Sequence, residues 1–68
     1  MDRNKKEVYA IARSILRKES CLSAWQFNKR LEKACRSSEE IYQKYYEIRA
    51  REWERLLETM EEEFSIAF

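Results

Sequence analysis

The fold of this chain is decided by the sequence LSAWQF at residues 22–27. Ser23 and Gln26 have the spacing of a capping box, in which the serine side chain accepts from the amide three residues on and the glutamine side chain accepts from the serine amide. The flanking leucine and phenylalanine occupy the two positions of a hydrophobic staple. The stretch therefore predicts a helix over residues 23–36, with its apolar face on Phe27 and Leu31.

A second helix signal precedes this stretch. Asn4 followed by Glu7 is typical of a helix start. Apolar residues then recur at the spacing of one helical face, namely Val8, Ile11, Ala12, Ile15 and Leu16. We predict a first helix over residues 5–19, which ends in a basic turn that suits the helix dipole.

A third helix signal follows. Ser37 and Glu40 repeat the capping-box spacing, and no glycine or proline interrupts the remaining chain. We predict one helix over residues 38–64, about 40 Å long at 1.5 Å per residue. The alternative is a single continuous helix over 23–64.

Composition favours an all-α fold in a single domain of residues 1–68. The 68-residue chain has no glycine and no proline, the residues that tight β-turns favour. A chain this short buries only about 60% of its unfolded surface, and small domains often oligomerise. The apolar face of the predicted helix over 38–64 would run along its whole length, and the two shorter helices would leave part of it uncovered. We therefore predict a three-helix unit that completes its bundle as a homodimer.

Charge is distributed unevenly along the chain. Residues 1–36 carry ten Lys and Arg against four Asp and Glu, a net charge of +6, whereas residues 37–68 carry four against nine, a net charge of −5. Such asymmetry indicates either a charged partner or pairing between the two halves. An antiparallel dimer would place the basic half of one chain beside the acidic half of the other.

Several function classes lack the residues they require. The chain has no histidine, no glycine-rich phosphate loop and no serine in a nucleophile motif, so we expect neither enzymatic activity nor a bound metal or cofactor. Cys21 and Cys35 would lie about 20 Å apart along a helix, too far for a disulfide. No apolar run approaches the roughly 20 residues of a membrane span, and the N-terminus does not have the pattern of a signal peptide. We expect a cytoplasmic protein.

The helix over 23–36 carries the strongest candidate for a binding site. A large aromatic residue, Trp25, lies away from the apolar face among basic residues, an arrangement that anchors interfaces or stacks on bases. Our leading hypothesis is a small adaptor or inhibitor that binds another protein. The candidate residues are Trp25, Gln26, Lys29, Arg30, Lys33 and Arg36. Alternatively, Trp25 packs against the first or third helix, with Lys29 over its ring.

The runner-up hypothesis is a small DNA-binding regulator. The segment 5–36 has the loose pattern of a helix-turn-helix, with the helix over 38–64 as a dimerisation arm. The second helix would present side chains that read bases and phosphates, namely Gln26, Asn28, Lys29, Arg30 and Lys33.

The predicted third helix has an aromatic face that could meet a second copy or a partner protein. Its candidate interface residues are Tyr42, Tyr45, Tyr46, Arg49, Trp53, Leu57 and Met60. Arg49 lies within this apolar face, where an arginine extends along its stem to water or pairs with a carboxylate. The alternative is an ordinary, partly exposed position without a specific role.

The C-terminal sequence EEEFSIAF at 61–68 is an acidic run followed by an apolar end. It resembles the tail tips of bacterial single-stranded-DNA-binding proteins, and the resemblance implies docking of the last aromatic residue and the chain carboxylate into a basic-rimmed pocket on a partner. The alternative is that Phe64, Ile66 and Phe68 cover the core of the bundle or a dimer seam.

Overall fold

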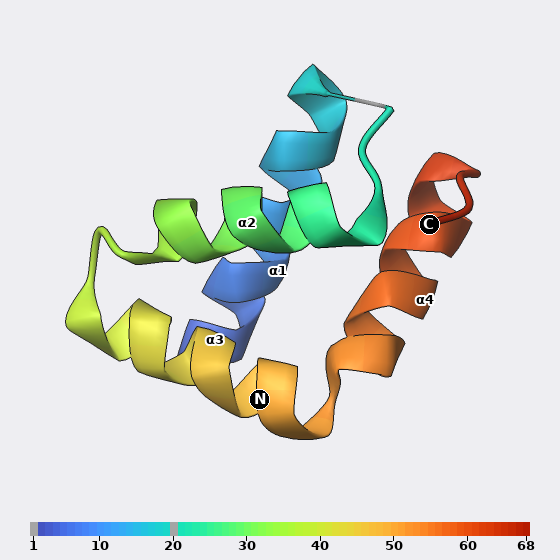
Figure 1. The fold of residues 1–68 in the computed structure, drawn as a ribbon. Coiled ribbons are helices and arrows are strands. Elements are labelled where there is room, and N and C mark those ends of the chain that lie inside the picture. Colours follow the sequence, from blue (N-terminus) through green and yellow to red (C-terminus); the bar gives the residue numbers. More distant parts are fainter. Residues whose placement is uncertain (1, 20) are drawn as a thin grey trace.

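A computed structural model describes residues 2–19 and 21–68 of the chain. This part of the chain contains no strand, so the all-α prediction is confirmed. It contains four helices rather than three, because the predicted third helix is divided in two. The helices are α1 (Arg3–Lys18), α2 (Ala24–Cys35), α3 (Glu39–Arg51) and α4 (Trp53–Phe64) (Figure 1).

The start of α1 lies earlier than the sequence pattern predicts. Asp2 is the N-cap, and its carboxylate accepts from the amides of Asn4 and Lys5 at 2.9 and 3.3 Å. An aspartate is a strong cap because its charge also suits the positive end of the helix dipole. The prediction that Asn4 caps the helix is therefore wrong.

The capping box of α2 is confirmed. The Gln26 amide donates to Ser23 Oγ at 3.2 Å, and the Ser23 amide donates to Gln26 Oε1 at 3.0 Å. The second predicted box is wrong, because Ser38 is the N-cap of α3 and makes no side-chain capping bond. Residues 36 and 37 form a turn instead, in which the Ser37 amide donates to the Ala34 carbonyl at 3.5 Å. This turn also excludes one continuous helix over 23–64.

The break between α3 and α4 lies at Glu52, whose φ and ψ of −134° and 20° are not helical. The Glu52 amide still donates to the Ile48 carbonyl at 2.8 Å, and the Glu52 carbonyl accepts from the Leu56 amide at 3.1 Å. An unbroken helix over 38–64 would be about 40 Å long, whereas the largest extent of the molecule is 29 Å. The break turns α4 back toward the core, and Lys5 of α1 holds the Glu52 carboxylate at 2.6 Å.

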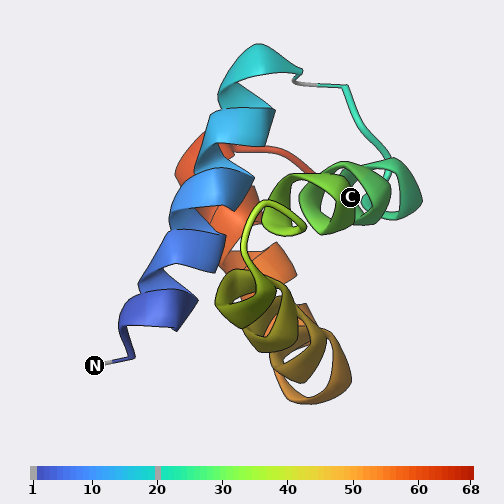
Figure 2. The same ribbon diagram turned by 90° about the vertical axis from the view of Figure 1, so that its left-hand side faces the viewer.

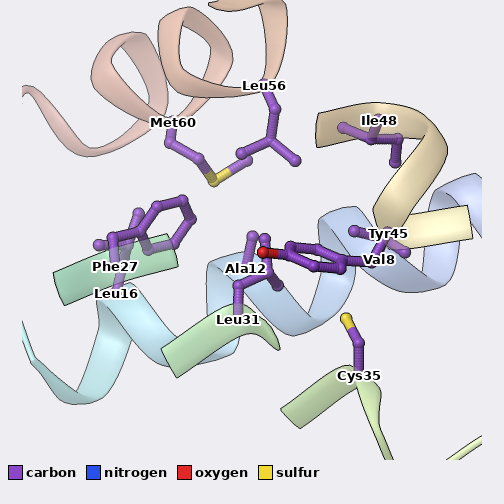
Figure 3. Packing of buried hydrophobic residues seen from close by; sticks show 10 residues of the cluster. All are labelled: Val8, Ala12, Leu16, Phe27, Leu31, Cys35, Tyr45, Ile48, Leu56 and Met60. Carbon is purple, nitrogen blue, oxygen red and sulfur yellow. The ribbon is translucent and has the colours of Figure 1, made fainter. Parts of the chain in front are cut away.

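All four helices contribute to one core (Figure 3). The buried residues are Val8, Ala12, Leu16, Phe27, Leu31, Cys35, Tyr45, Ile48, Leu56 and Met60. Figure 3 shows Leu56 and Met60 reaching from α4 toward the side chains that α1 and α2 supply. Each large apolar side chain that is fully buried stabilises the fold by about 1.5–3 kcal/mol. Because α4 covers this core within one chain, the uncovered stripe that prompted the homodimer prediction is absent here, and the dimer stays a prediction.

Ion pairs join the basic N-terminal half to the acidic C-terminal half. Besides the Lys5–Glu52 pair, Arg13 of α1 donates to both carboxylate oxygens of Glu63 at 2.7 and 3.0 Å. These bonds lower the pKa of the Glu63 carboxyl. Figure 2 shows α1 alongside α3 and α4, the arrangement that these pairs require. Part of the charge asymmetry is thus matched inside the molecule, on the α1 side.

The C-terminal tail folds back onto the core after α4. Ser65 adopts the left-handed conformation, with φ 53° and ψ 46°, and the Ile66 amide donates to the Glu61 carbonyl at 3.1 Å. This turn brings the ring of Phe68 to 5.1 Å from the ring of Phe27, measured between centroids. The tail therefore closes one side of the bundle.

The thiol of Cys35 is buried and forms no disulfide within the described part of the chain. Its burial raises its pKa to about 11, so it stays protonated near neutral pH. Within residues 2–19 and 21–68, none of the helices combines the length and the apolar character that crossing a bilayer demands.

Candidate protein-binding surface on helix α2

The orientation of α2 is set by its buried residues. Phe27, Leu31 and Cys35 are spaced by four residues and lie in the core, so they fix one face of the helix inward. Residues 25, 29, 33 and 36 fall on other faces and are exposed. We call this strip, Trp25, Lys29, Lys33 and Arg36, the α2 surface.

Trp25 is the most exposed large apolar side chain that the structure describes, with 68% of its surface accessible. The alternative that it packs against α1 or α3 is therefore wrong. The Lys29 ammonium lies 5.6 Å from the centroid of the indole ring. This contact confirms the part of that alternative in which Lys29 lies over the ring. A cation over the face of an indole is attracted by the ring quadrupole, and this attraction favours one position of an otherwise solvated ring.

Basic side chains surround an open hollow beside Trp25. The hollow is lined by Lys29, Arg30, Glu32, Lys33 and Arg36. Two of these cations have carboxylate partners: Arg30 binds Glu19 at 2.8 Å and Arg36 contacts Glu32 at 3.4 Å. Neither Lys29 nor Lys33 lies within ion-pair distance of a carboxylate of the described residues. Their two charges remain available to a partner.

Tyrosines of α3 continue the surface beyond Arg36. The Arg36 guanidinium lies 5.6 Å from the centroid of the Tyr42 ring. The Tyr42 and Tyr46 rings meet edge to face at 5.1 Å, and Tyr46 is 56% exposed. A second exposed aromatic side chain, Tyr46 of α3, therefore lies next to the Arg36 end of the α2 surface.

Three side chains predicted to read DNA bases have other partners. Gln26 takes part in the capping box and Arg30 binds Glu19. Asn28 is half-buried, and its Oδ1 accepts from the hydroxyl of the buried Tyr45. Burial raises the pKa of Tyr45 to about 12, so this hydroxyl keeps its proton and the bond persists. Of the predicted base-reading set, Lys29 and Lys33 are the two that are exposed and form no hydrogen bond or ion pair with the described residues.

The interface predicted on the third helix is not one face in the structure. Tyr45 and Met60 lie in the core, and the break at Glu52 separates the residues before it from those after it. Trp53 is half-buried, with its ring 6.0 Å from that of Phe27. The members that remain exposed or partly exposed are Tyr42, Tyr46, Arg49, Trp53 and Leu57.

Arg49 is exposed, and its guanidinium lies 4.7 Å from the centroid of the Trp53 ring. From the sequence we predicted that the Arg49 side chain extends to water or pairs with a carboxylate, and this aromatic contact was missed. The i,i+4 spacing of arginine and tryptophan could have indicated it.

The predicted tail-docking residues lie against the chain's own core. Phe64, Ile66 and Phe68 are partly buried on it, and the Phe68 amide donates to the Glu61 carboxylate at 2.9 Å. Of the two alternatives for the tail, the structure shows the one in which it covers the bundle.

A basic groove between α1 and α4 was missed by sequence reasoning. It is lined by Lys5, Lys6, Tyr9, Arg13, Arg55 and Thr59, and we call it the α1–α4 groove. The α1 members Lys6, Tyr9 and Arg13 have the i, i+3, i+7 spacing of one helical face. The sequence contains this spacing, but the position of this face of α1 opposite α4 depends on the break at Glu52.

Comparison with known proteins identifies no relative. No protein-family model, no curated protein and no solved structure matches this chain. In the described part of the chain, no three Cys, Asp or Glu side chains gather as a metal site would require. Inference about function therefore starts from the surface geometry.

Proposed function

We propose that this protein is a small non-enzymatic adaptor or inhibitor that binds an acidic protein surface through its α2 surface. The observation that carries the proposal is the exposure of Trp25 beside two lysines that form no ion pair with the described residues. The other tryptophan, Trp53, is half-buried against the core. Tryptophan is enriched among the residues that anchor protein interfaces, and Trp25 is held on a helix with its ring exposed to solvent.

The physical chemistry of the α2 surface suits such a contact. Burying an indole removes about 150–250 Å² of surface from water, and Lys29 already restricts the ring, which lowers the entropy lost on binding. Lys29 and Lys33 would steer an acidic partner and speed its association. Tyr46 and Arg36 would extend the contact past the end of α2.

This contact does not require a second copy of the chain. The strip from Trp25 to Tyr46 belongs to one molecule, and the core beneath it is closed by α4 of the same molecule. A homodimer would thus be compatible with the proposal but is not part of it.

The test is affinity capture with matched variants as bait. We expect the wild type to retain a stoichiometric partner that Trp25→Ala and the double variant Lys29→Gln/Lys33→Gln both lose, with helicity unchanged by circular dichroism. The double variant Arg17→Gln/Lys18→Gln removes the same number of charges from exposed positions of α1 and should retain the partner. Equal retention by all four baits would refute the proposal.

DNA binding is the second candidate, favoured only by the basic character of the α2 surface. With Gln26, Asn28 and Arg30 already engaged, such binding would rest on phosphate contacts and would weaken steeply with salt. Retention on duplex DNA at about 50 mM salt, lost in the Lys29→Gln/Lys33→Gln variant, would support this candidate. No retention under these conditions would exclude it.

A further inference from the structure

The α1–α4 groove is a second concentration of positive charge, separate from the α2 surface. Four of its six lining residues are cations: Lys5, Lys6, Arg13 and Arg55. They come from two helices that are far apart in the sequence and meet only because the chain breaks at Glu52. The groove is therefore a product of the tertiary fold.

Two of the four cations are neutralised by the protein itself. Lys5 is bound to Glu52 at 2.6 Å, and Arg13 holds Glu63 through two bonds. Lys6 and Arg55 are exposed and form no ion pair with the described residues. Two positive charges are thus left, one on each side of the groove.

The lining of the groove also includes the hydroxyl groups of Tyr9 and Thr59. Tyr9 is half-buried, and its hydroxyl makes no hydrogen bond within the described part of the chain. Burial raises the pKa of Tyr9, so the hydroxyl keeps its proton and can donate it. Thr59 differs, because its hydroxyl already donates to the Arg55 carbonyl at 2.9 Å.

We propose that the α1–α4 groove binds a phosphate group, with Lys6, Tyr9 and Arg55 as its donors. A phosphate carries about −1.5 to −2 charges near neutral pH and several acceptor oxygens, which matches two cations and one hydroxyl that approach from two helices. A carboxylate would balance only one of the two charges. Glu52 and Glu63 hold the other two cations of the groove, Lys5 and Arg13.

Nuclear magnetic resonance titration of the whole chain tests the site without reference to the α2 surface. Sodium phosphate is added at constant ionic strength maintained with sodium chloride. We expect saturating shifts confined to the amides near Lys6, Tyr9 and Arg55. The variants Lys6→Gln and Arg55→Gln should each weaken binding about tenfold, the effect of losing one charge-assisted hydrogen bond. Lys18→Gln, at an exposed position of α1 outside the groove, should leave the affinity unchanged.

The source of the phosphate is distinguished by a second probe, phenyl phosphate. Tighter binding of phenyl phosphate than of inorganic phosphate assigns the groove to a phosphorylated organic molecule, and weaker binding assigns it to the free ion. The proposal is overturned by non-saturating shifts spread over all basic side chains. It is also overturned by an affinity that neither Lys6→Gln nor Arg55→Gln changes. Both variants are at exposed positions, so their folding is expected to match that of the wild type.

Discussion

Two aromatic side chains should respond in opposite ways to replacement by alanine. Phe68 is partly buried, with its ring stacked 5.1 Å from that of Phe27, whereas Trp25 is 68% exposed. We therefore expect Phe68→Ala to destabilise the fold and Trp25→Ala to leave its stability nearly unchanged. The pair compares a residue that holds the molecule together with one that is available to a partner.

The size of each effect follows from burial. Full truncation of a buried phenylalanine costs about 3–5 kcal/mol, and Phe68 is only partly buried, so we expect a loss of about 2 kcal/mol in the free energy of unfolding. For a domain of this length each kcal/mol shifts the melting temperature by roughly 4–8 °C, so Phe68→Ala should melt about 8–16 °C lower. Trp25→Ala should change the free energy of unfolding by less than about 0.5 kcal/mol.

The assay is reversible thermal unfolding followed by far-ultraviolet circular dichroism, with urea unfolding as a second measure of stability. A melting temperature for Phe68→Ala within a few degrees of the wild type would show that the tail does not cover the core. An equal loss in Trp25→Ala would show that this side chain is packed. Either result would refute the reasoning from burial.

Three further outcomes follow from the structure. Ser65→Gly should raise the free energy of unfolding by about 0.5–1 kcal/mol, because a left-handed conformation costs a residue with a Cβ roughly 1 kcal/mol or more, and chemical denaturation measures this gain. Glu52 and Glu63 have pKa values below their usual 4.5, because cationic partners on α1 donate to them. Their contribution to stability is therefore complete above pH 4.5 and is lost as the pH falls through their lower values in the folded state. The double variant Glu52→Gln/Glu63→Gln should show a smaller drop in melting temperature on acidification than the wild type, and an equal drop would contradict the ion pairs. Sedimentation velocity at high micromolar concentration tests the homodimer that the sequence predicts: a dimer would support that prediction, and a monomer would show that one chain with its own closed core is sufficient.

Local signals in the sequence predict the start of α2 well. The capping box of Ser23 and Gln26 needs only neighbouring residues, and it forms as the spacing predicts. The same reasoning fails at Ser37 and Glu40, because the turn that ends α2 takes up residues 36 and 37. Capping patterns therefore locate this second helix start only to within one or two residues.

The break at Glu52 could not be predicted from local propensity. The residues around it, Arg51, Glu52 and Trp53, include good helix formers, and no glycine or proline marks the position. The break is favoured by packing, since it brings Leu56 and Met60 onto the core. Tertiary contacts outweigh the loss of regular helix there, and this one difference also changes the predicted interface and creates the α1–α4 groove.

The candidate site was predicted in part. The position of Trp25 away from the apolar face of α2 followed from helical periodicity, and so did the neighbourhood of Lys29 and Lys33. Whether α3 covered that strip depended on the turn at 36–38, which the pattern misplaced. The hydrogen bonds of Asn28 and Arg30 could not be predicted from the sequence, because their partners, Tyr45 and Glu19, lie on other segments.

The central claim is that the α2 surface is the contact for a protein partner. It is tested most directly by adding the captured partner to isotope-labelled protein and mapping the change in each amide and indole signal. We expect the largest changes at the Trp25 indole and at the amides of Lys29, Lys33 and Arg36. Changes confined to the α1–α4 groove or to the C-terminal tail, with the Trp25 indole unaffected, would contradict the claim.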